Sequence, residues 1–384
     1  MNPNIKQTLL GGLTYQEFLS EYWQQKPLLV RQAFNGSPID ISAEELAGIA
    51  CDTSAPSRIV IENGREPWES LFGPFDDDIF ANLPESHWTL LVNDLERYFP
   101  ELRQVIKKFH FIPDWRLDDL MLSYATTDGS VGPHIDDYDV FLIQTSGKRK
   151  WRIDSREDYN KETLKDCSLR LLKYFDSDHD WILKPGDMLY LPPNIPHYGL
   201  AQNNDCMTLS VGFRAPSQRE LIYNWVDSIL NSPQFNSLYR DKERVFQPNS
   251  AEISQDDIEQ LSKIILEGLD SRKNSLSVWL GKYLTETKGD SALDIEEKEG
   301  ESQDKQASNN YQRKSWLRLA LIEENQNIHF FADGEHFLLD HEAKEAINYL
   351  CNHYTYKKSL VEKFYKHAAF KIVFNKLLQG NGIA

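Results

Sequence analysis

Residues 132–153 read GPHIDDYDVFLIQTSGKRKWRI and contain two short apolar runs, each bounded by Gly, Pro, Asp or Lys. Runs of this length between turn residues are typical of β-strands. The same texture extends in both directions, from about residue 88 to residue 214. Further runs lie at 119–125, 188–193 and 207–213. Many short strands separated by turn signals indicate a β-sandwich or a β-barrel.

This stretch also carries His134 and Asp136, two residues apart. On a strand such residues point to the same face, so an imidazole and a carboxylate can reach one ion together. His197 follows further along, after a turn, an apolar run and the proline-rich loop in KPGDMLYLPPNIPHYG (184–199). Two histidines and one carboxylate leave adjacent positions open on a metal, as in the facial triad of non-haem Fe(II) oxygenases. A structural zinc site usually has a fourth protein ligand, and none is obvious here.

The charge of the chain limits the classes of partner. Its 384 residues include 42 Lys and Arg and 59 Asp and Glu, a net charge of −17, and residues 1–220 hold 34 acidic and 22 basic residues. This balance argues against general nucleic-acid or anionic-membrane binding and favours a basic partner. Four scattered cysteines, no signal-peptide pattern and no long apolar segment predict a cytoplasmic protein that is not bound to a membrane.

The remainder of the chain divides by composition. Residues 13–23 predict a short amphipathic helix, and 220–230 and 256–269 carry apolar stripes at helical spacing. Residues 285–310 contain few apolar and no aromatic residues, with 8 acidic against 3 basic, a composition that cannot form a core. We therefore expect a linker there.

A small module is expected beyond the linker. The runs 328–331 and 336–339 flank Asp333-Gly334, which is a hairpin turn signal. Helical patterns follow at 341–353, 358–367 and 369–378, so a winged helix is compatible with this part. Residues 341–384 carry only 7 basic and 3 acidic residues. That balance is too mild for a phosphate-tracking surface, and no direct DNA binding is expected.

Taken together, several segments resemble the JmjC-type ribosomal oxygenases, which are 2-oxoglutarate- and Fe(II)-dependent protein hydroxylases with a cupin-like double-stranded β-helix. The segments are FLSEYWQQKPLLVR (18–31), PDWRLDDLMLS (113–123), GPHIDDYDVFLIQTSGKRKWRI (132–153), LKPGDMLYLPPNIPHYG (183–199) and SVGFRAP (210–216). The resemblance is strongest to the bacterial branch, which hydroxylates the β-carbon of an arginine in large-subunit ribosomal protein L-sixteen.

The resemblance implies an α+β architecture in four parts. These are a JmjC or cupin jelly-roll catalytic domain at 1–215, a helical dimerisation region at 216–284, the linker at 285–310 and a winged-helix-like domain at 311–384. It also implies a homodimer that acts on a basic ribosomal protein with dioxygen as cosubstrate.

Site residues follow from the same resemblance. His134, Asp136 and His197 correspond to the Fe(II) ligands, and Ser123 would add a hydroxyl to the 2-oxoglutarate site. The distal carboxylate of 2-oxoglutarate needs a cation, and GKRKW offers Lys148, Arg149 and Lys150. Alternation separates Arg149 from the two lysines but does not choose the inward face. The family pattern favours Arg149, whose planar fork suits a carboxylate.

Strand alternation extends the prediction to the substrate. Asp119 shares a face with Ser123, and Tyr138 shares a face with His134. If Ser123 and His134 face the pocket, Asp119 and Tyr138 can flank it. A carboxylate and an aromatic ring suit a guanidinium group through ion pairing and stacking.

Two other functions remain open at this point. One keeps the iron and changes the protein substrate, as in a histidyl or asparaginyl hydroxylase or an N-methyl-lysine demethylase. The other is a catalytically idle cupin that serves as a dimeric binding module. An intact set of His134, Asp136, His197 and Arg149 argues against the idle module, which would have no reason to retain all four.

Overall fold

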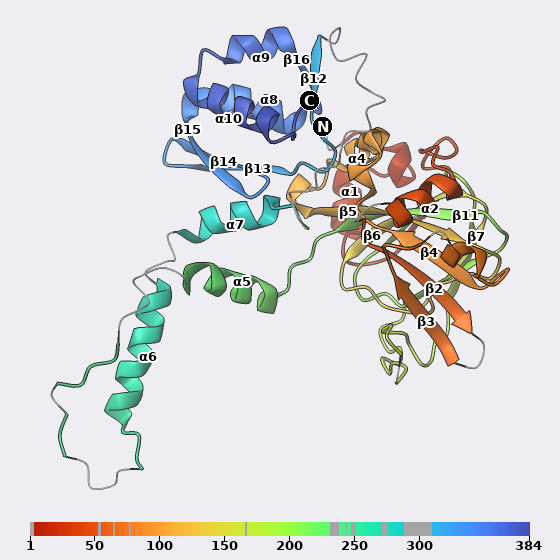
Figure 1. The fold of residues 1–384 in the computed structure, drawn as a ribbon, viewed down its shortest axis with the longest axis horizontal. Helices are drawn as coiled ribbons and strands as arrows, with labels where there is room; N and C mark the ends of the chain where they lie inside the picture. Colours follow the sequence, from red (N-terminus) through yellow and green to blue (C-terminus); the bar gives the residue numbers. More distant parts are fainter. Residues whose placement is uncertain are drawn as a thin grey trace.

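The N-terminal half of the chain forms a sandwich of two antiparallel β-sheets (Figure 1). The computed structural model describes residues 4–52, 55–63, 66–76, 78–165, 167–230, 238–242, 244–246, 251–270, 275–287 and 309–384. The larger sheet has the order β1 (Leu28–Val30), β9 (Met188–Leu191), β6 (Asp139–Ser146), β11 (Cys206–Phe213), β5 (Leu117–Ala125), β4 (Trp88–Val92), β2 (Ser57–Asn63) and β3 (Glu66–Phe72). The smaller sheet has the order β10 (His197–Ala201), β7 (Arg149–Ile153) and β8 (His179–Leu183).

The strands β9, β6 and β11 of the larger sheet are buried on both faces. In β6, Phe141 and Ile143 belong to the main core on the outer face, while Val140 and Leu142 pack toward the smaller sheet. A strand buried on both sides needs apolar residues at successive positions, which explains the unbroken run VFLI within β6. The two facing sheets confirm the predicted cupin-like jelly roll, whose interior lies between them.

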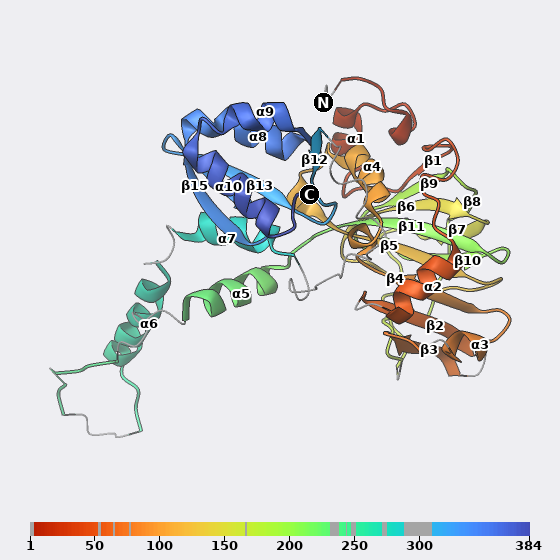
Figure 2. The same cartoon turned by 45° about the horizontal axis from the view of Figure 1, so that its top comes forward.

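Helices cover the outer face and the ends of the larger sheet (Figures 1 and 2). The capping box of Thr14 and Glu17 starts the first α-helix. The helical elements of this half are η1 (Thr8–Leu10), α1 (Tyr15–Glu21), α2 (Ala43–Asp52), α3 (Asp78–Ala81), η2 (Leu95–Arg97), η3 (Pro100–Leu102), α4 (Arg103–Ile106), η4 (Lys107–Phe109) and η5 (Asp114–Arg116).

One local prediction was wrong. His134 and Asp136 do not lie on a regular strand, because β6 begins only at Asp139 and His134 makes an isolated bridge to His197. Gly132 has a φ of +80° and Pro133 has no backbone donor, so the chain turns here and cannot extend a β-ladder. The two side chains meet through a loop and the bridge, not through alternation along a strand.

The second half of the chain begins with three helices, α5 (Gln218–Leu230), α6 (Gln255–Asp270) and α7 (Leu276–Thr285). Both views show α6 extending away from the rest of the chain (Figures 1 and 2). In contrast, α7 packs on the C-terminal sheet, where Gly281 meets the ring of Phe331 so closely that a Cβ would lie 2.4 Å from it. Of the predicted linker, residues 288–308 lie outside the described residues.

Residues 309–384, the C-terminal module, form a small sheet with helices packed on it. The predicted hairpin is confirmed, since Asp333 and Gly334 have φ values of 46° and 72° and join two paired strands. The elements are β12 (Asn310–Gln312), β13 (Leu319–Glu324), β14 (Asn327–Ala332), β15 (Glu335–Asp340), η8 (His341–Ala343), α8 (Lys344–Asn352), β16 (Thr355–Lys357), α9 (Lys358–Phe364) and α10 (Ala368–Gln379). Helices of the described residues include none that is both long and apolar enough to cross a membrane.

Candidate active site

The interior of the sandwich brings together the three predicted metal ligands. The ligand atoms of His134, Asp136 and His197 all lie within 4.8 Å of one another. Nε2 of His134 is 3.8 Å from Oδ1 of Asp136, and Nε2 of His197 is 3.6 Å from Oδ2. Within the described ranges this is the one group of three such side chains placed to share a metal ion.

Backbone hydrogen bonds hold the two histidines side by side. The amide of each donates to the carbonyl of the other at 3.0 Å, and the ring centroids lie 4.2 Å apart. Nδ1 of His134 is 2.9 Å from the carbonyl oxygen of Gly132, and Nδ1 of His197 is 2.9 Å from that of Ile195. A carbonyl only accepts, so each Nδ1 carries the proton and each Nε2 presents a lone pair to the cluster.

The electrostatics of the cluster favour the ligand form of His197. This ring is 3% exposed, and burial lowers its pKa to about 4, with a further lowering by His134 that Asp136 opposes. The ring is therefore neutral near pH 7, the state in which an imidazole binds a metal. The amide of Asn194 donates to the carbonyl of Asp136 at 2.8 Å, so the proline-rich loop also holds the backbone of Asp136.

Arg149 is the basic residue that faces the interior. It is 3% exposed, and its Nε and Nη2 atoms are buried without a hydrogen-bond partner. The next residue, Lys150, points outward and pairs with Asp180 at 2.7 Å. Pairing of β7 between β10 and β8 thus resolves the alternation that the sequence left open. A buried guanidinium without acceptors is costly, and the oxygens of an acidic ligand would supply those acceptors.

Ser123 lies on the inner face of β5. It is 5% exposed, and its hydroxyl donates to the carbonyl of Thr208 at 3.3 Å. Two residues further on, Ala125 packs with Ala201, the β10 residue paired with Arg149. Ser123 and Arg149 therefore lie toward the same end of the interior.

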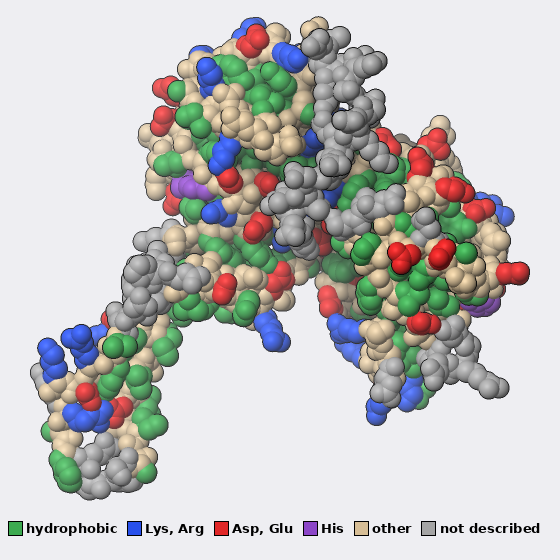
Figure 3. Space-filling model, in the orientation of Figure 1, with side chains coloured by type: hydrophobic (Ala, Val, Ile, Leu, Met, Phe, Trp, Pro, Cys, Tyr) green, Lys and Arg blue, Asp and Glu red, His purple; other side chains and the backbone are tan. Residues whose placement is uncertain are grey.

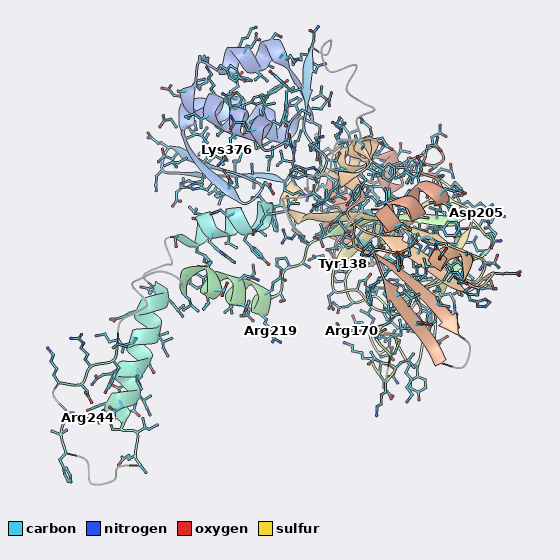
Figure 4. The ribbon with its side chains drawn as sticks, viewed as in Figure 1. Tyr138, Arg170, Asp205, Arg219, Arg244 and Lys376 are labelled. Atoms are coloured by element: carbon cyan, nitrogen blue, oxygen red, sulfur yellow. The ribbon has the colours of Figure 1, made fainter. Side chains whose placement is uncertain are left out.

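Asp119 is partly buried, and Tyr138 is the most exposed of the predicted site residues. Oδ2 of Asp119 accepts a hydrogen bond from Nδ2 of Asn93 at 2.7 Å. Burial raises the pKa of the Asp119 carboxyl group, and this hydrogen bond opposes the rise only in part. Tyr138 is 42% exposed, and its pKa is raised first by burial and then by the charges of Asp136 and Asp119. Tyr138 therefore lies within the influence of both carboxylates, on the side of the sandwich that faces α5 (Figure 4).

Two interior residues were missed by the sequence reasoning. Gly199 lies two residues after His197 and opposite Trp151, where an added Cβ would lie 2.8 Å from the indole. Gln144 accepts from the hydroxyl of Thr208 at 3.0 Å. A glycine inside a strand is a signal for a close approach of another group, and this signal could have indicated Gly199. No local signal marks Gln144.

The chain is similar to known proteins in sequence and in fold. Residues 104–221 match the JmjC domain family. The chain is 34% identical over 283 residues to ribosomal protein uL16 3-hydroxylase of Escherichia coli K12, covering 74% of each protein. It is 34% identical over 267 residues to a probable ribosomal oxygenase of Haemophilus influenzae, covering 67% of this chain and 64% of that protein.

A solved structure extends the similarity to nearly the whole chain. It is that of YcfD, a ribosomal oxygenase from Escherichia coli, in complex with cobalt and 2-oxoglutarate. It matches with a TM-score of 0.76 and 29% identity, over 97% of this chain and 98% of that one.

Proposed function

Since this chain belongs to the ribosomal oxygenases of the JmjC family, we propose that it hydroxylates the β-carbon of an arginine in ribosomal protein uL16. The chain is a 2-oxoglutarate- and Fe(II)-dependent oxygenase. One observation carries the chemistry. A cluster of two histidines and one carboxylate and a buried arginine without acceptors share the interior of one β-sandwich.

We assign Fe(II) to His134, Asp136 and His197. The donor set fits, because two imidazole nitrogens and one carboxylate form a facial triad, and the cobalt in the YcfD structure is a common stand-in for iron. Bound there, Fe(II) couples the oxidative decarboxylation of 2-oxoglutarate, which gives succinate and carbon dioxide, to insertion of one oxygen atom of dioxygen into a substrate C–H bond. The protein holds the ligands through the Gly132 and Ile195 carbonyls.

We assign the distal carboxylate of 2-oxoglutarate to Arg149, with Ser123 as a second contact. The Nε and Nη2 donors of Arg149 lie in one plane and have no acceptor, and a carboxylate supplies two oxygens in matching geometry. The surrounding interior residues Val140, Leu142 and Leu183 are apolar and buried, so they exclude water from the bound cosubstrate.

The substrate guanidinium is assigned to Asp119 and Tyr138. The charge of Asp119 offers an ion pair, and the half-exposed ring of Tyr138 offers a stacking surface beside Asp136. The net charge of −17 favours a basic ribosomal protein over an anionic substrate. Such a substrate is made in the cytoplasm, where we place the enzyme.

A homodimer through residues 216–284 is part of the proposal. Apolar side chains lie exposed along α5 and α6, including Ile222, Tyr223, Ile258, Leu261 and Ile265 (Figure 3). A second copy would bury these stripes. The predicted boundaries of a catalytic domain (1–215), a linker (285–310) and a winged-helix-like domain (311–384) remain predictions. The last is expected to contact protein and not DNA.

Mass spectrometry of uL16 tests the proposal. The purified ribosomal protein would be incubated with the enzyme, Fe(II), 2-oxoglutarate and dioxygen, beside a His134→Ala control. The expected result is a gain of one oxygen atom on one arginine, absent from the control. Turnover of 2-oxoglutarate to succinate without that gain would refute uL16 as the substrate and favour another basic protein. No turnover in metallated protein would favour the idle binding module.

A matched pair of variants tests the substrate contacts. Asp119→Asn should raise KM for the arginine substrate roughly 10- to 100-fold, because a charge-assisted hydrogen bond is worth about 1.5–3 kcal/mol. Asp205→Asn changes a residue of the turn before β11, where its carboxylate accepts a hydrogen bond from the Tyr124 hydroxyl, and should leave KM unchanged (Figure 4). An unchanged KM for Asp119→Asn would refute the assignment.

A further inference from the structure

In the larger sheet, β4 covers only part of the neighbouring edge of β5. β4 pairs with β5 from Thr89 opposite Ala125 to Val92 opposite Leu122, and then β4 ends. β5 begins five residues earlier, at Leu117. In the part of the chain that the structure describes, no strand lies beside residues 117–121 on this side. Their backbone groups on that edge need other partners, because a buried unpaired group is costly.

Those partners come from the C-terminal module. Nη2 of Arg318 donates to the carbonyl of Asp118 at 3.0 Å, and its Nε donates to the carbonyl of Leu117 at 3.4 Å. Nη2 also donates to Oε1 of Glu96 at 2.9 Å, while Oε2 of Glu96 accepts from the amide of Leu120 at 2.9 Å. Arg318 and Glu96 together therefore replace the missing strand.

The residue enclosed by these bonds is Asp119. Its own carboxylate accepts from Nδ2 of Asn93 and from the amide of Asp94, which lie three and two positions before Glu96. The hydrogen-bonded pair of Arg318 and Glu96 thus secures both the backbone on either side of Asp119 and the segment that orients its side chain. Arg318 is 7% exposed and Glu96 is 4% exposed, so water cannot substitute for either.

The C-terminal module also makes contacts with the N-terminal half that do not involve this pair. Arg313 pairs with Asp114 at 2.9 Å, and Arg103 donates to Gln312 and to the carbonyl of Arg313 across the same boundary. Those bonds reach the segments before β5, whereas Arg318 bonds to β5 itself. Arg313 and Arg318 are similarly buried, but Arg313 bonds to the segment before β5 and Arg318 bonds to β5.

We infer that Arg318 is a positioning residue through which the C-terminal module holds Asp119 in place to receive the guanidinium of the substrate. The inference rests on the proposed function, in which Asp119 contacts the substrate. It gives the C-terminal module a direct effect on substrate recognition, although the module lies outside the β-sandwich that holds the metal cluster (Figures 1 and 2).

The test compares Arg318→Met with Arg313→Met in the full-length protein. Amide hydrogen exchange should be faster at residues 117–121 in Arg318→Met and unchanged there in Arg313→Met. With an arginine peptide of uL16 as substrate, kcat/KM should fall on the order of 10- to 100-fold in Arg318→Met, through KM, as expected for a misplaced contact. The Kd for 2-oxoglutarate should stay within twofold, about the precision of such a comparison.

Arg318→Lys serves as a second variant if Arg318→Met folds poorly. A lysine keeps the charge beside Glu96 but lacks the fork that reaches two carbonyls, so an intermediate KM is expected. The inference is overturned if exchange at 117–121 is unchanged in Arg318→Met, or if Arg313→Met alters exchange and KM equally. If the wild-type enzyme leaves the peptide unoxidised, the proposed substrate fails, and the exchange comparison still decides whether Arg318 holds β5.

Discussion

Replacing Arg149 with methionine should have opposite effects on ligand binding and on the stability of the ligand-free protein. Nε and Nη2 of Arg149 are buried without partners, and the carboxylate of 2-oxoglutarate would satisfy both. Each charge-assisted hydrogen bond is worth about 1.5–3 kcal/mol, so two are worth about 3–6 kcal/mol. The Kd for 2-oxoglutarate in Arg149→Met should therefore rise roughly 100- to 10,000-fold.

Without 2-oxoglutarate the same change should not destabilise the fold. Each buried donor that lacks an acceptor costs about 1–3 kcal/mol, and methionine removes these donors while keeping an unbranched apolar stem. The side chain would pack beside Trp151, over which the guanidinium now lies at 5.8 Å. We expect the unfolding midpoint of ligand-free Arg149→Met to equal or exceed that of the wild-type protein.

Calorimetric titration of 2-oxoglutarate into Co(II)-loaded protein and thermal unfolding with and without the ligand measure both effects. Lys150→Met is the matched control, since its ammonium group pairs with Asp180 on the outer face. It should bind 2-oxoglutarate like the wild-type protein. Wild-type affinity in Arg149→Met, or a loss of ligand-free stability by several kcal/mol, would refute the assignment of Arg149 to the cosubstrate.

Three further predictions concern packing, pH and assembly. Gly199→Ala places a Cβ against the Trp151 indole and should lower the unfolding free energy by about 1–3 kcal/mol in urea titrations, and an unchanged value would contradict this packing. Burial raises the pKa of Glu96 from 4.5 to about 7, so the folded state retains a proton and stability should fall as pH rises from about 5 to 7.5. Glu96→Gln should remove about 2 kcal/mol of this pH-dependent loss of unfolding free energy. Identical pH profiles of the variant and the wild-type protein in urea titrations would argue against a raised pKa of Glu96. Ile265→Glu on the exposed stripe of α6 should give a monomer in sedimentation experiments, whereas Lys263→Gln, off that stripe, should leave a dimer; two dimers would exclude this face.

Much of the site was predictable because its signals are local. His134, Asp136 and His197 stand among strand and turn patterns that a jelly roll requires, and the runs at 140–146 and 207–213 lie within β6 and β11. The error at 132–138 has an equally local origin. The spacing of the histidine and the aspartate matched a strand, but Gly132 and Pro133 turn the chain there.

The residue types and their local spacing set the chemistry that the chain can offer. It contains two histidines and a carboxylate for a metal, three candidate cations at 148–150, and an acidic surplus that suits a basic substrate. These properties depend on residue types and on periodicity over a few residues.

Which of these groups meet depends on how distant segments of the chain pack together. Pairing of β7 with β10 and β8 turns Arg149 inward, and docking of the C-terminal module brings Arg318 to Glu96, 222 positions away in the chain. No pattern in either segment marks that pair. Burial removes water both from the guanidinium of Arg318 and from the edge of β5. The two therefore form hydrogen bonds with each other, although they lie far apart in the chain.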